Sequence, residues 1–220
     1  IDKNSVVVTN YGSSDGNIIK VINTKTNEVE KSIDLQGNIR VNGIVALPEP
    51  NKVAVIDYVS DNLLVLDIET DSIEKQIQTK QKKSHLLVLQ PNKPIAYVTN
   101  INSGSLSVID LNLNEVIKII PCGLGRKGIA ITPDGSEIWV TNTNLNSITI
   151  INTSTYQIID TLKTGDEPLK LKFSIDGEYC LVTNAIEGTI SVYNQQSKKK
   201  IKTIILHGIT TLFERILYHT

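Results

Sequence analysis

A short β-forming motif recurs through the chain, and this repetition constrains the fold more than any other feature of the sequence. The motif reads VVVTN at 6–10, VAVID at 53–57, YVTN at 97–100, IWVTN at 138–142 and CLVTN at 180–184. Measured at the valine two residues before its end, it returns after 47, 43, 42 and 42 residues. A fixed period in this range indicates supersecondary units that pack side by side. We therefore expect a single domain over residues 1–220, because each unit needs its neighbours to bury its faces.

Each repeat holds four candidate strands. In the third repeat they are Ile95–Asn100, Ser105–Asp110, Glu115–Ile120 and Gly128–Thr132, with turn residues between them. No repeat carries a run with the apolar spacing of a helix. Four short antiparallel strands per repeat are typical of a β-propeller blade. The sequence therefore predicts an all-β fold, a β-propeller of four-stranded antiparallel blades with five repeats.

Amide or acidic residues end two strands of each repeat. One set comprises Asn23, Asp67, Asp110, Asn152 and Asn194, and the set that ends the recurring motif includes Asn10, Asn100, Asn142 and Asn184. Such side chains hydrogen-bond the backbone two residues further on and start turns. We therefore interpret both sets as turn residues, and not as metal ligands or catalytic groups.

Two kinds of side chain are expected in the interior. Trp139 lies in the second strand of its blade, where packing between blades is expected. Cys122 and Cys180 occupy different positions in their repeats, so we expect buried free thiols instead of a disulfide.

The motifs resemble the YVTN family of β-propeller repeats over about residues 5–212. YVTN, SLSVID and GIAITPDG stand almost unaltered in the third repeat. The resemblance implies a propeller of the kind found in surface-layer and secreted proteins, with lactonase-like enzymes among the related propellers. Seven blades would be usual for the family, whereas five repeats are present here. The chain is therefore a closed five-bladed ring or part of a larger propeller, and pairing of the first strand with Gly208–Leu212 favours the ring.

Basic residues precede the innermost strand in most repeats. The loops that enter this strand usually surround the channel mouth, and loops carry function because packing constrains them less. We predict a ligand-binding mouth here, and Arg and Lys would favour a carboxylate, a phosphate or an acidic sugar. The same charges would also suit a solvated rim. The candidate residues are Arg40, Asn42, Lys83, His85, Arg126, Lys127 and His207.

Neither catalysis nor a bound metal is indicated by the sequence. There is no G-x-S-x-G, no H-E-x-x-H, no zinc-spaced cysteine pair and no phosphate loop. His85 and His207 occupy equivalent positions, but Glu167 is the one further ligand of a suitable type. We therefore expect no cofactor, no metal and no assigned catalytic residue, and the sequence leaves enzyme activity open.

The leading functional hypothesis is a non-catalytic binding scaffold. It would be extracellular, at the cell surface or periplasmic, and would bind a protein or a glycan through the mouth loops. The alternative is a lactonase-like hydrolase that acts on an anionic sugar lactone. The formal net charge of −1 gives no field for nucleic acid, and no apolar run is long enough to span a membrane. Self-assembly is a third hypothesis, with Glu214–Thr220 adding a strand to another chain.

Overall fold

The computed structural model describes residues 4–10, 15–125 and 128–206. These residues form nineteen strands in five sheets, with one short 3-10 helix at Thr143–Leu145. Neighbouring strands within each sheet run antiparallel, and four sheets have four strands in chain order across the sheet. The predicted all-β propeller architecture is confirmed.

The five sheets are the blades of the propeller, numbered here in chain order. Blade 1 has three described strands: β1 (Ser5–Thr9), β2 (Ile18–Asn23) and β3 (Val29–Asp34). Blade 2 consists of β4 (Val41–Ala46), β5 (Lys52–Asp57), β6 (Asn62–Asp67) and β7 (Ser72–Gln78). Blade 3 consists of β8 (Ser84–Leu89), β9 (Ile95–Asn100), β10 (Ser105–Asp110) and β11 (Glu115–Pro121).

The last two blades follow the same plan. Blade 4 consists of β12 (Ile129–Ile131), β13 (Glu137–Asn142), β14 (Ser147–Asn152) and β15 (Ile158–Lys163). Blade 5 consists of β16 (Pro168–Phe173), β17 (Tyr179–Asn184), β18 (Thr189–Asn194) and β19 (Lys200–Ile205). The recurring motif is the second strand of each complete blade.

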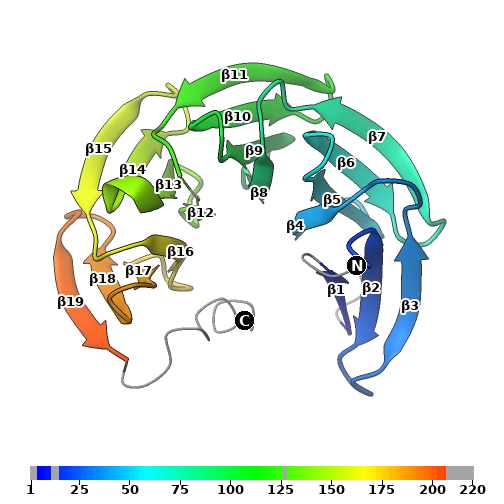
Figure 1. Cartoon of the computed structure of the whole chain (residues 1–220), viewed down its shortest axis with the longest axis horizontal. Helices are drawn as coiled ribbons and strands as arrows, with labels where there is room; N and C mark the ends of the chain where they lie inside the picture. Colours follow the sequence, from blue (N-terminus) through cyan, green and yellow to red (C-terminus); the bar gives the residue numbers. More distant parts are fainter. Residues whose placement is uncertain (1–3, 11–14, 126–127, 207–220) are drawn as a thin grey trace.

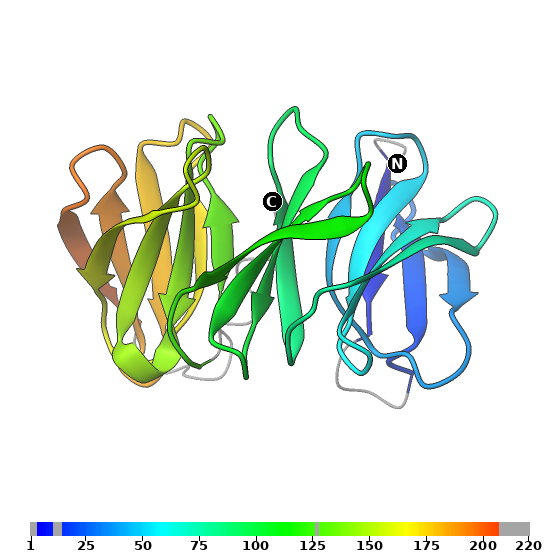
Figure 2. The same cartoon turned by 90° about the horizontal axis from the view of Figure 1, so that it is seen from above.

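The blades are arranged radially as an open arc. Strands β4, β8, β12 and β16 lie on the inner side, and β3, β7, β11, β15 and β19 form the outer side (Figure 1). Blades 1 and 5 stand at opposite ends of the arc in both views (Figures 1 and 2). The favoured closed five-bladed ring is therefore not formed by the described residues. Gly208–Leu212, which was predicted to complete blade 1, lies outside the described residues.

The core consists of layers of side chains between neighbouring blades. Ile56 of blade 2 and Val98 of blade 3 are both fully buried in one such layer. Between blades 4 and 5, the ring of the fully buried Trp139 meets Phe173 edge-to-face at a centroid distance of 5.3 Å. The predicted packing of Trp139 between blades is confirmed. Because apolar burial is the main stabilising term, each blade depends on its neighbours.

The two cysteines are buried free thiols, as predicted. Cys180 is fully enclosed in the layer between blades 4 and 5. This burial raises the pKa of its thiol, because a thiolate would lose its hydration there.

The threonine of the recurring motif supports a bulge in the innermost strand. In blade 3 the register shifts between Ser84 and Leu87, so two residues lie opposite Thr99. The Thr99 hydroxyl accepts a hydrogen bond from the Leu86 N–H at 3.1 Å. In blade 5 the register shifts between Pro168 and Leu171, and the Thr183 hydroxyl accepts from the Lys170 N–H at 3.1 Å. The hydroxyl thereby pairs a buried N–H that the bulge removes from the ladder.

The asparagine that ends the motif does not start a turn in the way we predicted. Asn100 is fully buried, and its Nδ2 donates to Ser105 Oγ at 3.2 Å and to Ser107 Oγ at 2.9 Å on the next strand. Asn142 and Asn184 make equivalent contacts with hydroxyls on β14 and β18. The turn interpretation is wrong for these three residues, because an amide held on the sheet reaches the neighbouring strand and not the loop backbone.

The other set of strand-ending residues does start turns. Asp110 Oδ1 accepts from the Asn112 N–H at 2.8 Å, and Asp67 Oδ1 accepts from the Glu69 N–H at 2.8 Å. The Thr70 and Glu69 N–H groups, both donors to this carboxylate, lower the pKa of Asp67 below its usual value. The turn interpretation is confirmed for this set.

Candidate functional site

One end of the blades carries all the described loops that enter an innermost strand. We call this end the mouth face. It comprises the loops between blades and the turns between the second and third strands, described at 35–40, 58–61, 79–83, 101–104, 122–125, 143–146, 164–167 and 185–188. The predicted site residues that the structure describes belong to these loops or to the first residues of the strands after them.

Lys83 and His85 gather around Tyr58 where blades 2 and 3 meet. Lys83 Nζ lies 4.4 Å from the centroid of the Tyr58 ring. The His85 ring is edge-on to the same tyrosine, with the centroids 6.3 Å apart. Lys83 also has a φ of 58°, which costs a non-glycine residue about 1–3 kcal/mol. The loop thus holds the Lys83 ammonium against the face of the Tyr58 ring.

Arg40 is exposed at the same junction, and its backbone is fixed by a buried carboxylate. Asp57 is 2% exposed, and its Oδ1 accepts from the Arg40 N–H at 3.1 Å. Asp57 also accepts from the Val59 N–H and the Ser60 hydroxyl. Tyr58 N–H donates to the Arg40 carbonyl at 2.8 Å. Asp57 therefore positions the loop and leaves the Arg40 guanidinium in solvent.

Asn42 has a structural task that the sequence did not reveal. Blade 2 carries Ile56 where blades 3 and 5 have the bulge-supporting threonine. Here Asn42 Oδ1 accepts from the Gly43 N–H in the bulge at 2.8 Å, which replaces the missing hydroxyl. The Asn42 side chain is buried, and its Nδ2 has no hydrogen-bond partner among the described residues. Asn42 thus supports the bulge of β4.

The remaining predicted site residues, Arg126, Lys127 and His207, lie outside the described residues, as does Glu214–Thr220. The structure brings two of the four described candidates together at one junction, with Arg40 close by. A complete basic ring around the mouth therefore stays a prediction.

A pocket of about 520 Å³ opens on the mouth face across three successive blades. Its walls come from turns of blades 3, 4 and 5 and from the two connections between them. Polar side chains dominate one wall and two isoleucines contribute the apolar part. The lining residues are Ile101, Gly125, Thr143, Asn144, Asn146, Asp166, Glu167 and Ile186.

Asn146 fixes the acidic side of the pocket. Its Nδ2 donates to Asp166 Oδ1 at 2.7 Å, and its Oδ1 accepts from the Glu167 N–H at 3.0 Å. The Glu167 carbonyl accepts from the Ala185 N–H of blade 5 at 2.9 Å. Asn146 and Glu167 have φ values of 47° and 56°, which non-glycine residues adopt only where the surroundings impose them. The Asp166 carboxylate and the Glu167 backbone are thus held in place by neighbouring turns.

Gly125 forms a wall that no other residue could form without displacement. A Cβ at this position would lie 2.5 Å from Thr143 Oγ1 and 2.8 Å from Asn144 Oδ1. The φ of Gly125 is 108°, which also favours glycine. The absence of a side chain therefore lets the 122–125 connection pack directly against the 143–146 turn.

Sequence reasoning missed most of this pocket. It concentrated on loops entering the innermost strands, whereas Thr143, Asn144 and Asn146 lie in the turn between the second and third strands of blade 4. Glu167 was considered only as a metal ligand or a general base. The amide-rich sequence TNTNLN at 141–146 is the signal that could have directed attention here.

Neither a metal cluster nor a membrane span is found in the described part of the chain. No group of three or more His, Cys, Asp or Glu residues there could hold a metal ion. Likewise, none of the helices in residues 4–10, 15–125 and 128–206 has the length and apolar character needed to cross a bilayer.

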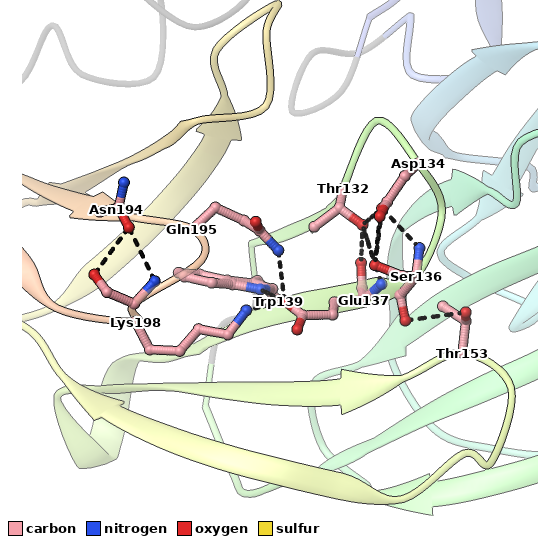
Figure 3. Close-up of polar contacts among 10 residues, drawn as sticks. Thr132, Asp134, Ser136, Glu137, Trp139, Thr153, Asn194, Gln195 and Lys198 are labelled. Atoms are coloured by element: carbon pink, nitrogen blue, oxygen red, sulfur yellow. Dashed lines mark hydrogen bonds and ion pairs between the residues drawn. The ribbon is translucent and has the colours of Figure 1, made fainter.

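The opposite end of the molecule carries a polar cluster that joins blades 4 and 5 (Figure 3). The Glu137 carboxylate accepts from Trp139 Nε1 at 2.9 Å and from Gln195 Nε2 at 3.2 Å, and it forms an ion pair with Lys198. The Lys198 ammonium also lies 5.2 Å from the Trp139 ring centroid. These groups satisfy one another, so the cluster is a clamp between blades.

Radial four-stranded blades with a pocket on the loop face define a β-propeller with a candidate ligand site at its mouth. The family described as "Lactonase, 7-bladed beta-propeller" matches residues 2–204, so the chain belongs to this family. The lactonase-like part of the predicted relationship is thereby confirmed. The finer assignment to YVTN repeats stays a prediction.

Comparison with individual proteins supports the propeller fold and nothing further. No curated protein matches the chain. The structure of Kuenenia stuttgartiensis hydrazine synthase is similar, with a TM-score of 0.72 and 19% sequence identity. The alignment covers 79% of this chain and 51% of that chain, so this chain spans about half the length of that protein.

Proposed function

We propose that this propeller is a binding module that contacts a glycan or a protein through its mouth face, without a chemical step of its own. The observation that carries the proposal is the pocket of about 520 Å³, to which blades 3, 4 and 5 all contribute. Its volume lies within the range of about 300–1,000 Å³ found for ligand sites. In the biological setting that we propose, the module is secreted or displayed at a cell surface.

The mouth-face loops are already fixed before a ligand arrives, so association costs them little conformational entropy. Asn146 already holds Asp166, and the Glu167 backbone is anchored to blades 4 and 5. Loops fixed on rigid blades lose little conformational entropy when a ligand arrives. The geometry therefore supports recognition without assuming a reaction.

Lactone hydrolysis is the second candidate function, and membership of the lactonase family is the observation that favours it. The reaction needs a group that activates water within hydrogen-bond reach of the lactone carbonyl. Glu167 is the candidate base in the pocket, and His85 is the candidate base at the junction of blades 2 and 3.

Binding and turnover measured on one protein preparation separate the two candidates. The binding proposal predicts capture of ligands from a panel of immobilised glycans and surface proteins, with loss of capture in Asn144→Ala. Asn112→Ala is the matched control, because Asn112 is an exposed amide in a turn at the opposite end of the blades. Hydrolysis of sugar lactones that disappears in Glu167→Gln would instead establish the enzyme and overturn the binding proposal.

A further inference from the structure

We propose that the mouth pocket takes the hydroxyl groups of a neutral glycan, and that it discriminates against acidic ligands. This inference rests on the proposed binding function and names its ligand class. It departs from the sequence-based expectation of an anion at a basic mouth.

Charge is the first reason. Among the described residues that line the pocket, the charged ones are Asp166 and Glu167, and both are carboxylates. The described cations of the predicted basic mouth lie elsewhere, since Lys83 stacks on Tyr58 between blades 2 and 3. Like charges at close range oppose association, and an uncharged ligand avoids this cost.

Hydrogen-bonding capacity is the second reason. A sugar hydroxyl both donates and accepts, so it needs a site that offers both functions. The carboxylates accept, the Thr143 hydroxyl does both, and the exposed Asn144 amide supplies donors and an acceptor. Asn146 is a positioning residue, because its amide is committed to Asp166 and to the Glu167 N–H.

The apolar wall is the third reason. Ile186 is 69% exposed, and Ile101 lines the pocket from the turn of blade 3. The C–H faces of a sugar ring can pack on such side chains and remove them from water. Gly125 packs directly against Thr143 and Asn144, so its loop closes the polar side of the pocket.

Isothermal titration with defined trisaccharides tests the inference. The neutral probes are cellotriose, maltotriose and chitotriose, and the acidic probe is trigalacturonate. We expect at least one neutral probe to bind, and trigalacturonate to bind at least about tenfold more weakly, which corresponds to about 1.4 kcal/mol. Gly125→Ala should weaken the neutral complex by about tenfold or more, because the added methyl group enters the wall.

Two further pocket variants decide the question if Gly125→Ala does not fold. Ile186→Ala removes an exposed side chain, and its matched control is Ile175→Ala, which is 99% exposed at the opposite end of the blades. Asn144→Ala is paired with Asn112→Ala in the same way. The pocket variants should weaken binding, and both controls should bind like the unmodified protein.

The outcomes distinguish this inference from the proposed function. Equal or tighter binding of trigalacturonate, or unchanged binding in the pocket variants, overturns the neutral-glycan inference but leaves a mouth-face binding module in place. Absence of binding by every trisaccharide also overturns the inference. Capture of a protein partner that is lost in Asn144→Ala would still support the function.

Discussion

Asn100 Nδ2 in β9 lies 2.9 Å from Ser107 Oγ in β10, so the last residue of the recurring motif joins the second strand of the blade to the third. The equivalent distances are 2.8 Å from Asn142 to Thr149 and 2.9 Å from Asn184 to Ser191. All three asparagines are buried. The motif is therefore a packing and hydrogen-bonding unit, and the ligand site that we propose lies in the turns that follow it.

The asparagine clamp, meaning the hydrogen bonds from Asn100 to Ser105 and Ser107, should make a measurable contribution to the free energy of unfolding. Asn100→Ala leaves two buried serine hydroxyls without their donor, and we expect it to lower the free energy of unfolding by about 2–3 kcal/mol. Urea denaturation followed by circular dichroism measures this change. The exposed Asn112→Ala should change stability by less than about 0.5 kcal/mol.

Blade 5 offers an internal comparison for the same clamp. Asn100 Oδ1 accepts from the Ser84 hydroxyl at 2.9 Å, whereas Pro168 replaces that serine beside Asn184. Asn184 Oδ1 accordingly has no hydrogen-bond partner among the described residues. Asn184→Ala should therefore cost less than Asn100→Ala, and an equal or larger loss would contradict this account of the clamp.

A buried threonine of the recurring motif gives the second prediction. Thr141→Val keeps the side-chain shape but leaves the buried Gly128 N–H without its side-chain acceptor, so we expect a loss of about 1–3 kcal/mol. The control is Thr161→Val, because Thr161 is exposed on β15. Equal urea midpoints for the two variants would show that this hydrogen bond does not stabilise the blade.

Clear turn residues made most of the blade strands predictable. The predicted strands at 95–100 and 105–110 coincide with β9 and β10 because turn residues flank both. The predicted strand Gly128–Thr132 is shorter, since β12 covers Ile129–Ile131. The Gly128 N–H donates to the Thr141 hydroxyl instead of a backbone carbonyl, while the Gly128 carbonyl still accepts from the Thr141 N–H.

The site was less predictable because it depends on contacts between blades. Sequence position identified Lys83 and His85 as mouth residues, but Tyr58 joins them from the neighbouring blade. The pocket combines the 143–146 turn with the 164–167 connection, whose side chains meet only after blades 4 and 5 pack. Asn42 was selected by position alone, and the bulge uses its amide oxygen.

The polar cluster around Glu137, which joins blades 4 and 5 at the end opposite the mouth face, yields the third prediction. Lys198→Met removes the cation from the mostly buried Glu137 carboxylate, and we expect a loss of about 1–3 kcal/mol. Amide hydrogen exchange in β17 and β18 should also accelerate, because the clamp ties blade 5 to blade 4. Lys199→Met is the matched control, since Lys199 is an exposed neighbour. Unchanged exchange in Lys198→Met would contradict a clamping role.

Acid sensitivity follows from two equivalent turns at the same end. The Thr132 hydroxyl and the Ser136 N–H lower the pKa of Asp134 from 3.8, and the Ser174 hydroxyl and the Glu178 N–H do the same for Asp176. A lowered folded-state pKa contributes stability above the unfolded value, and this contribution is lost as the pH falls through the folded value.

The double variant Asp134→Asn, Asp176→Asn should therefore lose less stability than the unmodified protein between about pH 5 and pH 2. Urea unfolding at successive pH values gives the two profiles. Parallel profiles would mean that these carboxylates do not contribute to acid unfolding.

Hydrogen exchange measured with and without ligand tests the central claim, a binding site on the mouth face, most directly. The ligand is the tightest-binding trisaccharide of the neutral panel, at saturating concentration. We predict slower exchange in 143–146 and 164–167, with no change in the turns at 111–114 and 174–178 at the opposite end. Protection confined to the opposite end, or no protection at saturation, would contradict the account.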